Sequence, residues 1–205
     1  MKNDKTIRAV IFDIGGVLIR TGDYAARRKW EIQFGLPKGK LSHLVFGSPV
    51  AARAMLGEIT EADVWQHVAG TLKVSDEQMS QLVADFWSCE GLNAELVQFA
   101  RTLRPHYQTT ILSNAFSTAR QAVIDNFQLD ATFDPMIISA EVGLAKPDAR
   151  IFHLAAQRMG VLPDEAIFID DVLENIESAR AVGMRGVQFK DTTQAIMEVR
   201  KYLGE

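Results

Sequence analysis

The sequence contains a single cysteine, Cys89, among its 205 residues. One cysteine cannot form an intramolecular disulfide, and it cannot build a thiolate cage around a metal ion. The chain also lacks an apolar run long enough to span a bilayer, and the apolar stretch before Asp13 is too short for a secretory leader. These absences predict a cytoplasmic protein with no membrane partner.

Clusters of basic residues are missing as well. The chain has 22 Lys and Arg residues against 26 Asp and Glu residues, which gives a net charge of -4. Without a basic stripe to follow a phosphate backbone, nucleic acid is excluded from the expected partners. Glycine and proline are too few for a low-complexity chain, and hydrophobic residues make up 47% of the sequence. This composition predicts a globular protein with a substantial core.

Short aliphatic segments alternate with amphipathic helical patterns over the second half of the chain. Apolar side chains recur at helical spacing in three places: Leu92, Leu96, Phe99 and Leu103; Phe116, Ala119, Val123 and Phe127; and Ile151, Leu154, Ala155 and Met159. The expected strands are Ala9–Phe12, Thr109–Leu112, Met136–Ile138 and Ala166–Ile169, with a weaker fifth at Gly186–Phe189. Continuously apolar strands that alternate with helices predict an α/β fold with a parallel, Rossmann-like sheet covered on both faces.

The first expected strand is separated from the second by almost a hundred residues, and the pattern between them is helical only. Thr60 with Asp63, and Ser75 with Gln78, form capping-box patterns that begin two of these helices. We therefore expect residues 21–88 to form a small all-helical cap, inserted into a core domain made of residues 1–20 and 89–205.

Polar residues follow the expected strands, at the edge where parallel strands present their carboxyl ends to a common crevice. Asp13 follows the first strand, Ser113 and Asn114 follow the second, and Asp170 and Asp171 follow the fourth. Carboxylates at one sheet edge repel each other unless a cation holds them, and hard oxygen ligands favour Mg²⁺. Lys146, which precedes a helix, and Ser113 could bind an incoming anion. A carboxylate nucleophile, a metal and an anion site together indicate phosphoryl transfer.

These residues resemble the haloacid dehalogenase (HAD) superfamily of aspartate-nucleophile hydrolases. All four motifs of that family occur in order and span almost the whole chain. They are Phe12-Asp13-Ile14-Gly15-Gly16-Val17, Leu112-Ser113-Asn114, Lys146-Pro147-Asp148, and Ile169-Asp170-Asp171 followed by Asn175. The helical insertion after the first motif is similar to the mobile cap of the family.

The resemblance implies a role for each matching residue. Asp13 is expected to be the nucleophile that becomes a phosphoaspartate, and Ser113 and Lys146 to be catalytic groups that hold the phosphoryl oxygens. Substrate contacts are expected from Ser113, Lys146, Asn114 and Gly16. The expected Mg²⁺ ligands are Asp13, the Gly15 carbonyl, Asp171 and Asp170. We favour Asp171 over Asp170 because its spacing to Asn175, which is expected to support the site, would place both on one helical face.

Gly15 is a departure from the family pattern. Most phosphatases of the family have an aspartate there, which protonates the leaving alkoxide and then activates water. The variant motif resembles a phosphatase subgroup related to the amino-terminal domain of soluble epoxide hydrolases and to some sugar-phosphate phosphatases. Losing the acid therefore does not imply losing activity.

The sequence leaves three functions open. The first is a Mg²⁺-dependent phosphatase of a small phosphorylated metabolite. The second is a 2-haloacid dehalogenase, which also lacks the acid but uses no metal; the acidic pair Asp170 and Asp171 argues against it. The third is a non-catalytic phosphate-binding domain. Asp148 is interpreted as a helix N-cap rather than a site residue, and the oligomeric state is left open.

Overall fold

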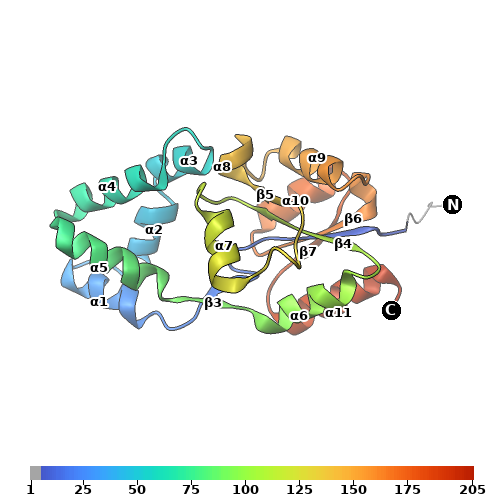
Figure 1. Cartoon of the computed structure of the whole chain (residues 1–205), viewed down its shortest axis with the longest axis horizontal. Helices are drawn as coiled ribbons and strands as arrows, with labels where there is room; N and C mark the ends of the chain where they lie inside the picture. Colours follow the sequence, from blue (N-terminus) through green and yellow to red (C-terminus); the bar gives the residue numbers. More distant parts are fainter. Residues whose placement is uncertain (1–5) are drawn as a thin grey trace.

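A five-stranded parallel sheet forms the centre of the protein, a computed structural model in which residues 6–205 are described (Figure 1). The expected core range 1–20 begins with five residues that lie outside the described residues. In spatial order the strands are β5 (Met136–Ile138), β4 (Gln108–Ser113), β1 (Ala9–Phe12), β6 (Ala166–Asp170) and β7 (Arg185–Gln188). The predicted parallel α/β fold is confirmed, and the bounds of the strands differ from the expected ones by a residue or less.

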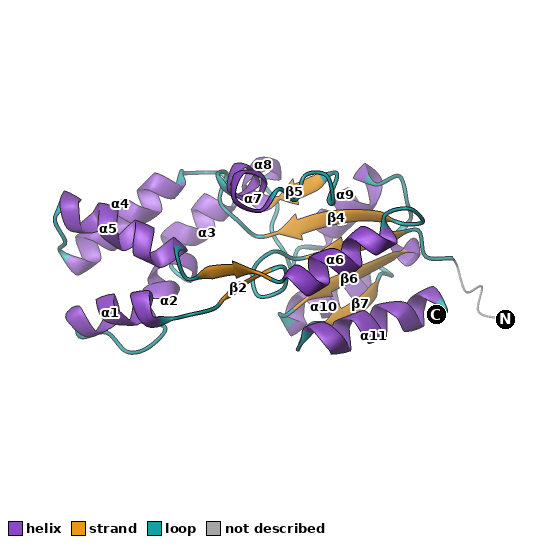
Figure 2. Ribbon diagram, turned by 60° about the horizontal axis from the view of Figure 1, so that its bottom comes forward, coloured by secondary structure: helices purple, strands orange, loops and turns teal. Residues whose placement is uncertain are grey.

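The central strand β1 is buried on both faces, because its side chains alternate between two hydrophobic clusters. Val10 and Phe12 pack with α6 (Ala94–Leu103), α7 (Ala119–Phe127) and α11 (Thr192–Leu203). Ala9 and Ile11 pack with α9 (Ala149–Arg158) and α10 (Leu173–Ala181) on the opposite face. Figure 2 shows α6 and α11 in front of the sheet. Covering both faces explains why the strand sequences are continuously apolar.

Six helices lie between β1 and β4, and the first five form a unit apart from the sheet, at the left of Figure 1. We call these helices the cap: α1 (Ala25–Gln33), α2 (Lys40–Phe46), α3 (Pro49–Met55), α4 (Glu61–Leu72) and α5 (Asp76–Trp87). They enclose their own hydrophobic cluster, which includes Trp30, Trp65 and Phe86. Both predicted capping boxes are present, at the start of α4 and of α5.

Two short strands, which the sequence did not predict, connect the cap to the sheet. β2 (Ile19–Thr21) and β3 (Glu90–Leu92) pair antiparallel, at the two points where the chain leaves and re-enters the core. Arg27 of α1 reaches this ribbon: its guanidinium hydrogen-bonds to Thr21 and forms an ion pair with Glu90. The chain therefore enters and leaves the cap along one ordered ribbon.

Two apolar residues that were expected in helices lie elsewhere. Leu92 ends β3, and α6 begins two residues later, with Asn93 as its N-cap. Phe116 precedes α7 and packs into the hydrophobic cluster of the cap. The remaining short helical segments are α8 (Ser139–Val142) and the 3₁₀ turn η1 (Pro163–Glu165). Over residues 6–205, the structure contains no helix with the length and apolar character that crossing a membrane requires.

Candidate active site

The polar residues predicted to converge do meet at the carboxyl edge of the sheet. Asp13 follows β1 at the centre, Ser113 ends β4 on one side, and Asp170 ends β6 on the other. Carboxylate oxygens of Asp13, Asp170 and Asp171 all lie within 4.8 Å of one another. Asp13 and Asp170 are buried, whereas Asp171 is exposed.

Lys146 brings a positive charge between two of these carboxylates. Its Nζ lies 2.9 Å from Asp13 Oδ1 and 2.6 Å from Asp170 Oδ2, and it donates a third bond of 3.1 Å to the Leu112 carbonyl. The lysine is 4% exposed. All three ammonium protons therefore have an acceptor, which is what a buried charge requires.

Asn114 holds the backbone of Lys146 from two sides. Its Oδ1 accepts from the Lys146 N–H at 2.8 Å, and its Nδ2 donates to the Lys146 carbonyl at 2.8 Å. Both polar groups of the amide are thus engaged with the loop that carries the lysine. The structure gives Asn114 a positioning role; its predicted contact with substrate stays a prediction.

The carboxylate of Asp170 is fixed by hydrogen bonds from α10 and from the residue that precedes this helix. Asn175 Nδ2 lies 3.2 and 3.1 Å from the two Asp170 carboxylate oxygens, and the Val172 N–H donates to Oδ1 at 2.8 Å. The expectation that Asn175 shares a helical face with Asp171 is wrong, because α10 begins only at Leu173 and leaves Asp171 outside the helix. The supporting role of Asn175 is directed to Asp170 instead.

Burial and crowding of charge shift the ionisation of the site. Burial raises the pKa of Asp13 to about 6; the Asp170 charge adds to the rise, while Lys146 and a hydrogen bond from Ser113 oppose it. Burial lowers the pKa of Lys146, but the charges of Asp13 and Asp170 outweigh it and hold that pKa above its usual value. The pKa of Asp171 is raised by burial and by the Asp170 charge. The site carries more negative charge than Lys146 alone neutralises.

The two glycines of the first motif serve different purposes. Gly16 has φ +77°, and a Cβ there would lie 2.4 Å from Asp171 Oδ2, so any other residue would strain the backbone and displace that carboxylate. Gly15 has no such constraint: a Cβ would meet nothing within 4 Å, and its φ lies outside the left-handed region. The absence of a side chain at Gly15 is therefore not imposed by the turn.

The donor set fits a hard divalent cation. Three carboxylates that approach within 4.8 Å supply oxygen ligands and excess negative charge. The Asp170 oxygens already accept hydrogen bonds from Lys146, Asn175 and Val172, whereas Asp171 is exposed to solvent. The preference for Asp171 over Asp170 as a ligand stays a prediction. The predicted ligand role of the Gly15 carbonyl stays a prediction.

Asp148 caps a helix, as interpreted from the sequence. Its carboxylate accepts from the Arg150 N–H at 2.9 Å at the start of α9 and pairs with the Arg150 guanidinium. Lys146 is held in the site by its ion pairs with Asp13 and Asp170, whereas Asp148 pairs with Arg150 and is not among the carboxylates that meet there.

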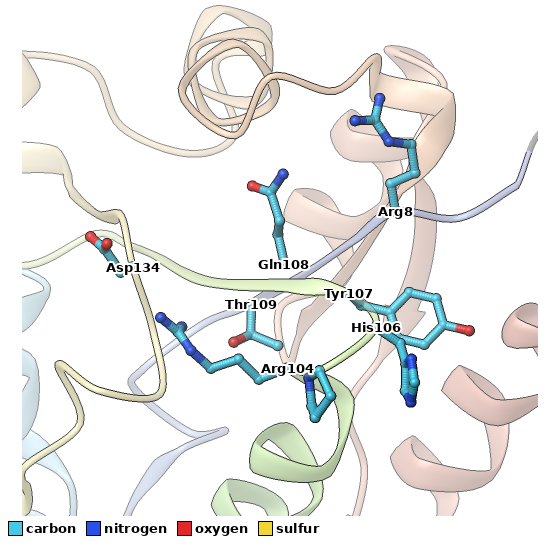
Figure 3. A pocket seen from close by; sticks show the side chains of 8 residues that line it. Arg8, Arg104, His106, Tyr107, Gln108, Thr109 and Asp134 are labelled. Carbon is cyan, nitrogen blue, oxygen red and sulfur yellow. The ribbon is translucent and has the colours of Figure 1, made fainter.

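A surface pocket of about 410 Å³ lies away from this site, at the amino ends of β1 and β4. Figure 3 shows Arg8, Gln108 and Asp134 among the residues that line it. Strands of a parallel sheet bring catalytic groups together at their carboxyl ends, so this pocket is not part of the candidate active site.

Comparison with known families identifies the chain. A family model of haloacid dehalogenase-like hydrolases matches residues 7–183. The chain belongs to this family. The resemblance stated from the four motifs is confirmed, and with it the assignment of the protein as a hydrolase.

The chain is also similar to two curated relatives and to a solved structure. The chain is 30% identical to mouse acyl-CoA dehydrogenase family member 10 over 98% of its own length, but it spans only 19% of that protein. It is 26% identical to the sesquiterpene phosphatase astK of Aspergillus oryzae, with coverage of 97% of this chain and 98% of the relative. A HAD family enzyme from Bacteroides thetaiotaomicron, solved as a magnesium complex, superposes with a TM-score of 0.73 at 25% identity over 91% of this chain and 94% of the other.

Proposed function

We propose that the protein is a Mg²⁺-dependent phosphatase of small phosphate monoesters that works through an aspartyl-phosphate. The observation that carries this proposal is the buried pairing of Asp13 with Lys146, beside Ser113 and two further carboxylates at one sheet edge. A phosphatase among the relatives that match nearly full length, and a magnesium complex among the structural neighbours, support it.

The proposed reaction has two displacements. A carboxylate oxygen of Asp13 attacks phosphorus, the bond between phosphorus and the ester oxygen breaks, and the alcohol leaves with the electron pair and takes a proton from water. A second water molecule then attacks phosphorus of the phosphoaspartate, and the bond between phosphorus and the Asp13 oxygen breaks, which restores the carboxylate and releases inorganic phosphate. The proton lost by this water neutralises the hydroxide left by the first step. Lys146 and Ser113 hold the phosphoryl oxygens as charge develops on them.

Asp13, Asp171 and Asp170, with the Gly15 carbonyl, are the groups that would hold Mg²⁺. When bound, the ion would offset the negative charge of the carboxylates and of the phosphoryl group. Lys146 alone leaves the cluster negative, so an incoming phosphate dianion would meet repulsion without a further cation.

Hydrolysis of an aryl phosphate tests the proposal. Wild-type protein should release phosphate with Mg²⁺ and lose that activity in chelator. Asp13→Asn keeps the shape of the side chain but removes the nucleophilic charge, so its turnover should fall to background while its circular dichroism spectrum stays unchanged. A variant that retained a tenth of wild-type activity would exclude Asp13 as the nucleophile.

A 2-haloacid dehalogenase is the second candidate, and a phosphate-binding domain without turnover is the third. Halide release from a 2-haloacid in chelator would establish the second. Phosphate binding by calorimetry with no ester hydrolysis would establish the third. The crowding of Asp13, Asp170 and Asp171 argues against binding a carboxylate substrate without a metal.

A further inference from the structure

Large apolar side chains stay partly exposed where the cap meets the core. Phe46, at the end of α2, is 38% exposed, and Trp87, at the end of α5, is 37% exposed. Their rings lie 5.8 Å apart in an edge-on contact, and both contact Phe86 in the interior of the cap. The other Phe, Trp and Tyr residues of the cap are buried or half-buried, so these two rings form an aromatic edge that the cap leaves uncovered.

This aromatic edge contacts the core at the loop that follows β4. The Phe46 ring stacks on Phe116 with centroids 6.0 Å apart. Phe116 stands three residues after Ser113, on the same loop as Asn114. Three residues of chain reach at most about 10 Å, so the edge lies close to the residues that hold the phosphoryl group. Figure 1 shows α2 on the side of the cap that faces the sheet.

A second pair of exposed apolar residues lies on the opposite flank of the nucleophile. Val172 and Leu173 directly follow Asp171 and are 46% and 47% exposed. In the sheet, β4 and β6 lie on either side of β1. The loop that contacts Phe46 therefore flanks Asp13 on one side, and Val172 with Leu173 flanks it on the other.

We propose that these residues bind the organic part of the substrate and that this part is apolar, so that phosphate monoesters of aliphatic or alicyclic alcohols are preferred over those of sugars and nucleosides. This inference rests on the phosphatase function proposed above. Exposed apolar side chains on both flanks of a polar centre match a molecule with a charged head and an apolar body. A sugar or nucleoside would instead have to bury its hydroxyl groups against Phe46, Trp87 and Leu173, at a cost in unmade hydrogen bonds.

A series of primary alkyl phosphates from butyl to octyl separates apolar binding from chemistry, because the leaving alcohols have nearly equal acidity. Each methylene that becomes fully buried should raise kcat/KM by about fourfold. Partial burial of four methylenes should still give octyl phosphate an advantage of about tenfold or more over butyl phosphate, measured below the micelle concentration.

Phe46→Ser and Leu173→Gln should each reduce the octyl-to-butyl ratio of kcat/KM, because the longer chain loses more apolar contact than the shorter one. The Leu173 variant guards against a folding defect, because Phe46 also packs inside the cap. Met197→Gln is the matched control: Met197 is 66% exposed on α11, and its replacement should leave the ratio unchanged.

Equal rates for butyl and octyl phosphate, with aryl phosphate still hydrolysed, would overturn the apolar substrate and leave the phosphatase function intact. If no ester is hydrolysed, both proposals fail. If Phe46→Ser and Leu173→Gln dissociate an oligomer without changing the ratio, the exposed residues form a contact between copies of the chain, and the substrate proposal is wrong.

Discussion

Replacing Gly15 with aspartate tests whether the enzyme lacks only the leaving-group acid. The structure accommodates the change, because a Cβ at Gly15 would meet nothing within 4 Å and the backbone there is not left-handed. General acid catalysis contributes about 10²- to 10⁴-fold where it operates. Gly15 is exposed, and an exposed carboxyl has a pKa near 4, so only a small fraction is protonated at neutral pH. We therefore expect Gly15→Asp to gain about 10²-fold on alkyl phosphates, the lower end of that range.

The assay is the dependence of kcat/KM on the acidity of the leaving alcohol. Wild-type protein should hydrolyse aryl phosphates much faster than alkyl phosphates, because phenolates leave without a proton. Gly15→Asp should flatten this dependence by accelerating the alkyl esters most. Magnesium affinity has to be measured for both proteins, so that a change in metal binding is not mistaken for acid catalysis.

Gly16→Ala is the matched control. Its Cβ would overlap the Asp171 carboxylate at 2.4 Å in a left-handed backbone, so this variant should lose metal affinity and activity on every ester. Equal rates of wild-type protein on aryl and alkyl phosphates would refute the missing acid, since another group would then already supply the proton. A Gly15→Asp variant that binds magnesium normally and leaves the dependence on leaving-group acidity unchanged would refute it as well.

Three further predictions concern other parts of the site. Burial raises the pKa of Asp13 to about 6, and a proton competes with the metal for that carboxylate. Mg²⁺ affinity measured by calorimetry should therefore be constant above pH 6 and fall about tenfold per pH unit below it. Equal affinity at pH 5 and pH 7 would contradict this prediction. Asn114→Ala removes both side-chain bonds to the Lys146 backbone. A shift of Lys146 by about 1 Å should lower kcat/KM by about 10²-fold at an unchanged melting temperature. Wild-type kinetics would exclude a positioning role for Asn114. The cap should exclude phosphopeptides, so phosphate release from one at the rate of a small ester would argue against a closing lid.

The sequence predicted the sheet and the convergence of the site because both depend on short local patterns. Asp13 directly follows a buried strand, and Ser113 and Asp170 each end one. The carboxyl ends of parallel strands lie at one edge of the sheet, so these residues meet there. β2 and β3 were missed because three-residue strands in which two or more residues are exposed or half-buried carry no apolar pattern.

Other features depend on contacts between distant segments, which periodicity does not report. The spacing of Asp171 and Asn175 predicts a shared helical face only if the helix begins before Leu173, and Asn175 pairs with Asp170 instead. The bond between Asn114 and the Lys146 backbone joins residues 32 positions apart. A side chain would meet the Asp171 carboxylate at Gly16 but meet nothing at Gly15. The motif alone does not reveal this difference, because it depends on where the Asp171 carboxylate lies.

Phe116 is supplied by the core but completes the hydrophobic cluster of the cap, where it is 4% exposed. A cap excised on its own would lack this ring, and losing a buried phenylalanine costs about 3–5 kcal/mol. The same dependence limits the exchange of caps between related hydrolases. A grafted cap meets whatever side chain the host has at the position of Phe116, so the two must be transferred together. The cap and the loop that carries Phe116 therefore form one packing unit, although 28 residues of chain lie between Phe116 and the last residue of α5.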